Sequence, residues 1–227
     1  MPNSTRKMSD YADWVSREIS HQPPGDIVRS WAQKWESLFR TLQGADAPIE
    51  LAGLVIARWE FLGALSLGNT ENTGVRDAIY YLDNWLMKAN SKYVSAKKLV
   101  TNMDPAPRLD IFSMLRNSPF HGVVPAGIAT SDSTGVVTWW VGTQGIEATN
   151  HLLVDNDGGL HVDVTLLCAE LVSSMTLYAA YLDEDKDAID GRTPKCRMKR
   201  ALWARYAPKF MRAIAWMNEG TTRGIPT

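Results

Sequence analysis

Apolar side chains recur every three or four residues in several stretches of the chain, which is the pattern of helices that pack through one face. The first stripe predicts a helix that begins at Ile27, with Asp26 as its cap, and ends at Gly44. Its apolar positions are Val28, Trp31, Trp35, Leu38, Phe39 and Leu42. A second helix is predicted from Pro48 to about Leu65, because proline is tolerated in the first turn of a helix.

The next stretch carries the most regular spacing. From Val75 to Tyr93 the apolar residues alternate steps of four and three, and we predict one continuous helix that ends near Leu99. A loop rich in turn-forming residues, over positions 68–74, separates it from the preceding helix. A fourth, shorter helix is predicted to open at Asp104.

The hydrophobic period changes from helical to alternating after Gly135. Strands are predicted over residues 135–142, 146–154 and 160–163, with turn-forming residues between them. Because short strands joined by turns usually pair with their neighbours in the chain, we expect a small antiparallel β-meander over residues 135–163.

Two further helices follow the predicted strands. The apolar stripe over residues 167–182 keeps helical spacing throughout, and Thr193 with Pro194 restarts a last helix. The stripe of that last helix is Trp203, Tyr206, Phe210, Ile214 and Met217, with a kink or break expected at Pro208.

The pattern as a whole predicts a mainly α fold. We expect a bundle of about five to six helices, with the β-meander inserted before the penultimate long helix. The chain divides into an N-terminal arm over residues 1–25, a single helical domain over 26–220 and a C-terminal tail over 221–227.

Composition excludes several classes of protein. The 227 residues are 45% hydrophobic and 22% charged, as in an ordinary globular domain. The net charge of −1 argues against a protein that coats nucleic acid, but leaves room for one local basic site. Two cysteines form no disulfide framework, the N-terminus has no apolar leader, and the longest uncharged stretch is interrupted by proline and glycine. We therefore expect a soluble, cytoplasmic protein with no membrane span.

Metal and nucleotide motifs are missing from the sequence, and no pair of histidines has zinc-ligand spacing, so no cofactor is predicted. The residues that suggest chemistry are Arg116, Asn117 and His121. An imidazole moves protons near neutral pH, and a guanidinium holds two phosphate oxygens and stabilises negative charge. Asn117 lies four residues before His121 and could orient its ring. The alternative is a surface arginine and a histidine at a helix end.

The segments Leu115-Arg116-Asn117 and Phe120-His121-Gly122, following helical seams, resemble the HEPN superfamily (higher eukaryotes and prokaryotes nucleotide-binding). Its motif is an arginine followed after four to six residues by a histidine, often with a polar residue next to the arginine. The resemblance implies a helical bundle, a metal-independent endoribonuclease activity and a homodimer whose two motifs line one cleft. It assigns the scissile phosphate to Arg116, acid/base catalysis to His121 and a supporting role to Asn117. Pro119 departs from a smooth helix.

Charge is also segregated near the C-terminus. No Asp or Glu occurs from Gly191 to Asn218, whereas five acidic residues lie between positions 183 and 190. The basic stretch predicts RNA-binding positions at Arg197, Lys199, Arg200 and Arg205. In this interpretation Trp203 and Tyr206 are available to stack on bases, although both lie on the apolar stripe and are expected in the core. The alternative is a solvated helix face balanced by the acidic turn.

Two functions therefore remain open. The first is a HEPN-type endoribonuclease in which an RNA 2′-hydroxyl attacks the adjacent phosphate. The second is a non-catalytic helical bundle that binds a partner or itself. Trp139 and Trp140 point to opposite sides of a predicted strand, so one of them is either a dimer contact or a rim residue.

Overall fold

A computed structural model of the chain describes residues 22–45, 48–71, 73–94, 128–129, 136–137, 139–142, 151–153 and 160–206. These residues are mainly helical, which confirms the predicted helical bundle. The helices are α2 (Pro24–Gly44), α3 (Pro48–Leu67), α4 (Val75–Tyr81), the π-helical turn η1 (Leu82–Leu86), α5 (Met87–Ala89) and α8 (Val164–Glu184). Residues 194–206 form a further helix. The strands are β1 (Ile128–Ala129), β2 (Val136–Val137), β3 (Trp139–Gly142) and β4 (Leu160–Asp163).

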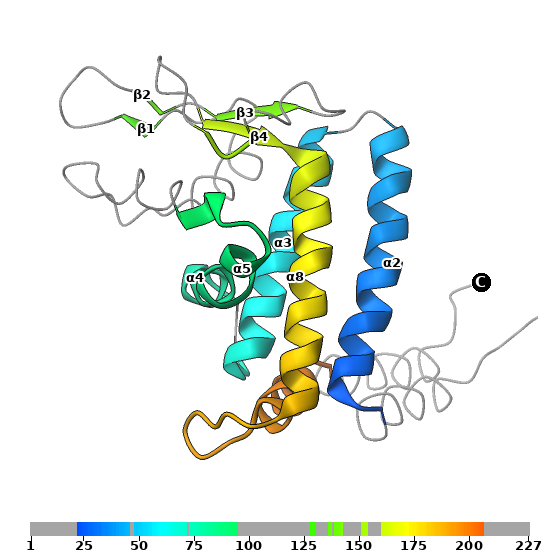
Figure 1. Cartoon of the computed structure of the whole chain (residues 1–227), viewed down its shortest axis with the longest axis vertical. Helices are drawn as coiled ribbons and strands as arrows, with labels where there is room; N and C mark the ends of the chain where they lie inside the picture. Colours follow the sequence, from blue (N-terminus) through cyan, green and yellow to red (C-terminus); the bar gives the residue numbers. More distant parts are fainter. Residues whose placement is uncertain are drawn as a thin grey trace, which may run out of the picture.

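Three long helices run along the molecule. Figure 1 shows α2, α3 and α8 side by side along the long axis, with α4 seen nearly end-on to the left of α3 and α8. Helix α8 contacts both α2 and α3, and α3 packs closely on α4. Strands β3 and β4 lie at the N-terminal end of α8, and the helix of residues 194–206 lies at the other end (Figure 1).

The core is formed by apolar and aromatic side chains from all of these helices. The predicted stripe of α8 is confirmed, because seven of its members are buried: Leu167, Cys168, Leu171, Met175, Tyr178, Ala179 and Leu182. Trp59 is fully buried on α3, and its indole N–H donates to the carbonyl oxygen of Ala78 over 2.9 Å. Each large apolar side chain buried in this way contributes roughly 1.5–3 kcal/mol to stability.

Helix α2 begins three residues earlier than predicted. Its first residue is Pro24, and Asp26 lies in the first turn and makes no capping hydrogen bond. Proline suits this position because the first helical amides have no partner within the helix. The predicted end at Gly44 is confirmed, as is the predicted start of α3 at Pro48.

The third predicted helix is wrong as a single element. It changes to π-helical turns at Leu82 and is interrupted after Ala89, where Asn90 is extended with φ −145° and ψ 115°, and residues 92–94 are helical again. The Asn90 side chain explains the break, since its amide oxygen accepts the backbone N–H of Lys92 and thereby competes with helical bonding.

The described strands do not form the predicted antiparallel meander. β3 pairs with β4 in parallel, whereas β1 and β2 form a separate antiparallel pair. Residues 151–152 lie in a turn, so this part of the predicted strand 146–154 is wrong, and most of that strand lies outside the described residues. Parallel strands need a long connection, and the 17 residues 143–159 lie between β3 and β4. The turn-forming residues in this stretch led to the prediction of tight turns between neighbouring antiparallel strands.

Candidate functional site

The predicted catalytic residues Arg116, Asn117 and His121 lie outside the described residues, as does Pro208. Their assignment therefore stays a prediction. The four predicted RNA-binding residues are all described, and they lie on the helix of residues 194–206.

This last helix begins at Pro194, as predicted, because Thr193 caps it. The Thr193 hydroxyl accepts the backbone N–H of Cys196 over 3.4 Å, and its carbonyl accepts that of Arg197 over 3.0 Å. Such bonds supply partners for amides that the helix itself leaves unsatisfied. The local sequence therefore sets the start of the helix.

The helix has two distinct faces. Met198, Ala201 and Leu202 are fully buried and attach it to the bundle. The opposite face is formed by residues three and four positions apart that are exposed or partly exposed: Cys196, Lys199, Arg200, Trp203 and Tyr206. One face of the helix therefore combines cationic and aromatic side chains at the surface.

Trp203 and Tyr206 were expected in the core, and this prediction is wrong. Trp203 is 54% exposed and Tyr206 is 38% exposed. The reason is that Arg197, a charged residue, occupies a buried position and continues the inward stripe with Met198 and Ala201. Because the prediction considered only apolar residues, it assigned the side of the helix with Trp203 and Tyr206 to the core and missed the side with Arg197.

The four predicted RNA-binding cations differ in their surroundings. Arg200 is exposed and Lys199 is partly exposed, whereas Arg197 is only 4% exposed. The Arg205 guanidinium donates to the carbonyl oxygen of Asn69 over 3.0 Å, and burial lowers its pKa. Lys199 and Arg200 are thus accessible to a ligand, while Arg197 and Arg205 are bound to the rest of the fold.

The acidic turn before this helix neutralises only part of the basic stretch. Asp185 accepts the backbone N–H of Lys195 over 3.2 Å and pairs with its ammonium group at 3.7 Å. Within the described ranges, no ion pair joins Lys199 or Arg200 to a carboxylate. The predicted balance by the acidic turn therefore applies to Lys195 and not to the exposed face.

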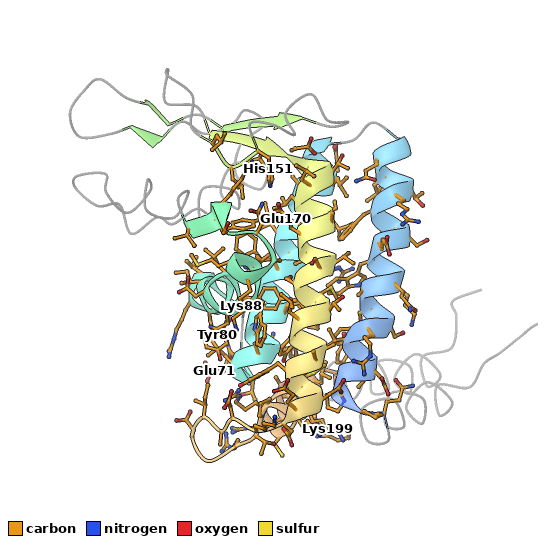
Figure 2. The ribbon with its side chains drawn as sticks, in the orientation of Figure 1. Glu71, Tyr80, Lys88, His151, Glu170 and Lys199 are labelled. Atoms are coloured by element: carbon orange, nitrogen blue, oxygen red, sulfur yellow. The ribbon has the colours of Figure 1, made fainter. Side chains whose placement is uncertain are left out.

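A second polar cluster was not predicted from the sequence. The carboxylate of Glu170 on α8 accepts the hydroxyl of Tyr93 over 2.7 Å and contacts His151 Nε2 at 3.1 Å, and it also accepts the side-chain amide of Asn90. Figure 2 shows His151 and Glu170 close together near the N-terminal end of α8. Burial, followed by the charge of Glu170, raises the pKa of Tyr93 well above its ordinary value.

The hydrogen bonds define the state of this histidine. His151 Nδ1 accepts the backbone N–H of Asp163 over 2.9 Å, so the ring proton lies on Nε2 and is donated to Glu170. Both ring nitrogens are thus engaged, and His151 is only 1% exposed. This cluster joins three parts of the fold through hydrogen bonds to one carboxylate. No residue spacing in the sequence indicates it.

A groove of about 380 Å³ lies between α2 and α8. Its lining residues are Glu36, Phe39, Arg40, Gln43, Thr165, Cys168, Ala169, Val172 and Ser173. Burial raises the pKa of the Cys168 thiol to about 12, so the sulfur is not a nucleophile near neutral pH. Among the described residues, no group of three or more His, Cys, Asp or Glu side chains is arranged to hold a metal ion.

Comparison of the chain with protein-family models, with curated proteins and with solved structures finds no match. The structure shows a small, mainly helical bundle. With no similar protein to compare, a function can be argued only from the residues of this chain.

Proposed function

We propose that this protein binds single-stranded RNA through the exposed face of its last described helix and cleaves it without a metal ion. The observation that supports binding is the exposed indole of Trp203 beside Lys199 and Arg200 on that face. The HEPN-type motif of Arg116 and His121 is the proposed catalytic part.

The composition of the exposed face suits an unpaired strand. An indole at the surface stacks on a base that is not already paired in a duplex, which contributes about 1–3 kcal/mol per base. Lys199 lies four residues before Trp203 and Arg200 lies three before it, so both cations are on the same side of the helix. Cations beside a stacked base attract the neighbouring phosphates, independently of sequence.

The proposed chemistry needs a proton acceptor and a charge stabiliser. The RNA 2′-hydroxyl attacks the adjacent phosphorus while His121 takes its proton, and the bond to the 5′-oxygen of the next nucleotide breaks. His121 then returns the proton to the leaving 5′-oxygen, and the products are a 2′,3′-cyclic phosphate and a 5′-hydroxyl. Arg116 holds the additional negative charge of the transition state, and Asn117 supports the pair. A cytoplasmic homodimer with both motifs in one cleft is part of this proposal.

Cleavage is tested with purified protein and a labelled RNA in EDTA. The wild-type chain is expected to give 2′,3′-cyclic phosphate ends, and His121→Ala is expected to give none. His21→Ala is the matched control, because it removes a histidine outside the motif. Loss of cleavage in EDTA, or unchanged cleavage by His121→Ala, contradicts the proposed mechanism.

Binding is tested separately by the fluorescence anisotropy of a short uridine oligomer. Trp203→Ala is expected to weaken binding about tenfold, as the loss of one stacked base implies. Lys34→Ala removes an exposed cation from α2 and serves as the control for net charge. Equal affinities for wild type and Trp203→Ala exclude this face as the RNA site.

The alternative is a non-catalytic bundle that binds a protein partner or itself. The same exposed Trp203 favours it, because tryptophan is a frequent anchor of protein interfaces. RNA affinity separates the two, since a protein interface predicts no binding to the uridine oligomer at any salt concentration.

A further inference from the structure

Arg197 is a charged side chain buried where α8 and the last described helix meet. It is 4% exposed, and within the described part of the chain its guanidinium has one hydrogen-bond partner, the hydroxyl of Tyr181 at 3.4 Å from Nη2. Nε and Nη1 are shielded from solvent and donate to nothing. No ion pair with a described carboxylate neutralises this charge.

The position of Arg197 is held by close packing. Its side chain lies against Gly68, which has φ +71° and follows the end of α3. A Cβ atom at Gly68 would stand 3.0 Å from the Cβ of Arg197. The first carbons of the Arg197 side chain are therefore packed against the backbone at Gly68.

Unsatisfied donors on a buried charge are strongly unfavourable. The large majority of buried polar groups in proteins have a partner, and leaving one without an acceptor destabilises the fold. An isolated buried charge is more costly than a neutral group. Arg197 thus needs an acceptor that carries negative charge and comes from outside the described chain.

The surroundings of Arg197 include a further donor. The Tyr181 hydroxyl contacts Nη2 at 3.4 Å and can donate a hydrogen bond to a ligand. The charge of Arg197 also reaches the hydroxyls of Tyr80 and Tyr178, and it opposes the rise in their pKa values that burial causes. The acidic residue whose charge reaches Tyr80 is Asp187, and its side chain is exposed. A guanidinium with a hydroxyl donor beside it is complementary to an oxyanion.

We propose that Arg197 and Tyr181 form a binding site for an oxyanion of the phosphate type. Tyr181 is partly exposed and contacts the guanidinium. Because Nε and Nη1 are covered, the anion displaces the Tyr181 ring as it binds. The site is separate from the exposed face proposed to bind RNA. The site does not include the predicted catalytic residues, so phosphate binding can be tested whether or not the protein cleaves RNA.

The test is a thermal denaturation series with inorganic phosphate, and with chloride at matched ionic strength. Phosphate is expected to raise the Tm saturably and beyond the effect of chloride. Tyr181→Phe removes the hydroxyl that contacts the guanidinium and is expected to weaken the apparent phosphate affinity about tenfold. Arg40→Ala removes a cation that is 74% exposed on α2 and is expected to leave the phosphate effect unchanged.

A second variant covers a possible loss of folding. Arg197→Lys keeps the positive charge but loses the planar set of donors, so its phosphate affinity is expected to fall as well. If Arg197→Lys does not fold, the result with Tyr181→Phe, a change at a partly exposed residue, decides. If phosphate raises the Tm no more than chloride does, the proposal is overturned and a buried water is the acceptor. A Tm increase in phosphate that neither variant changes also overturns the proposal.

The source of the phosphate is distinguished by competition. A uridine oligomer with a 5′-phosphate is compared with one bearing a 5′-hydroxyl. If inorganic phosphate displaces only the phosphorylated oligomer, the site takes the phosphate of a nucleic acid. If it displaces neither while still raising the Tm, the site takes a free anion. Both results support the site, and neither requires RNA cleavage.

Discussion

The crossing of α3 over α4 depends on the absence of a side chain at Gly63. A Cβ atom there would stand 2.0 Å from the carbonyl oxygen of Asp77, and backbone atoms cannot move away as a flexible side chain can. Gly63→Ala is expected to destabilise the protein by about 3 kcal/mol, because the two helices must separate. The measurement is the midpoint of urea denaturation at unchanged slope.

Gly44 offers a matched control for this substitution. It also lies in a helix, but a Cβ atom built there meets nothing within 4 Å. Gly44→Ala is expected to change the unfolding free energy by less than about 1 kcal/mol. Equal effects at the two positions would show that the close crossing of α3 and α4 is wrong.

The two cysteines are expected to differ in reactivity. Cys168 is 4% exposed and burial raises its pKa to about 12, whereas Cys196 is exposed. The thiolate is the reactive form, so Cys168 stays protonated and slow at pH 8. A disulfide reagent such as DTNB is expected to modify one thiol rapidly in the native protein and both thiols in urea. Rapid modification of two thiols in the native state contradicts the buried position of Cys168.

At the scale of elements, Glu170 joins α8 to the turn after α5 and to the segment at His151. Glu170→Gln places an amide N–H₂ group against donors that now face a carboxylate, so one buried donor loses its acceptor. The expected destabilisation is about 1–3 kcal/mol. Urea denaturation measures it, and faster exchange of the Asp163 amide hydrogen, which donates to His151, locates it.

Glu184→Gln is the control for this change. Glu184 lies on the same helix, its side chain is 63% exposed, and its ion pair with Lys186 spans 3.8 Å. Its loss is expected to change stability by about 0.5 kcal/mol or less. A Glu170→Gln variant as stable as Glu184→Gln would show that the cluster around Glu170 is not formed.

The sequence predicts some elements better than others, and the reason is the kind of interaction that determines each element. Helix α8 was predicted because its apolar residues all face one core. The helix after Val75 was predicted as continuous, but Asn90 interrupts it through its own side chain, which hydrophobic spacing does not register. Strand pairing failed because a parallel pair depends on contacts between distant residues.

The candidate site divides in the same way. The basic stretch was visible in the sequence, but its division into exposed Arg200 and buried Arg197 depends on which face of the helix packs. The three-element cluster around Glu170 had no sequence signal, since Tyr93 and His151 are far from it in the chain. Spacing predicts neighbours on one element, whereas a site between elements requires the fold.

At the scale of the whole molecule, α8 raises the question of a membrane. It is long and apolar enough to cross a bilayer by length and composition, with 44% of its most apolar window buried. However, Ser174 on α8 contacts the Tyr81 hydroxyl at 3.1 Å, and Glu170 is bound by donors from other elements. Transfer of α8 into lipid would break these bonds in a medium without replacements.

We therefore expect the protein to remain in the aqueous phase. After mixing with phosphatidylcholine vesicles and flotation, it is expected in the bottom fraction without detergent. Substitution of Leu177 on the exposed side of α8 by Ser is expected to leave this distribution unchanged, because that residue is already 37% exposed. Co-flotation of wild-type protein with vesicles contradicts the expectation.

The charge of the whole molecule bears on the proposed RNA binding. With a net charge of −1, the protein as a whole does not attract RNA, so the proposal depends on a local basic face such as that of Lys199 and Arg200. If Lys199 and Arg200 each neutralise one phosphate of a single strand, the logarithm of the binding constant is expected to fall with the logarithm of salt concentration at a slope of about −1.4. Arg200→Ala is expected to reduce the slope to about −0.7, and Trp203→Ala to lower affinity at unchanged slope. Anisotropy titrations measure the slope and the affinity. They cover salt concentrations of roughly 50 to 200 mM, over which such slopes are determined. A steeper wild-type slope that Arg200→Ala does not change would place the RNA on another surface.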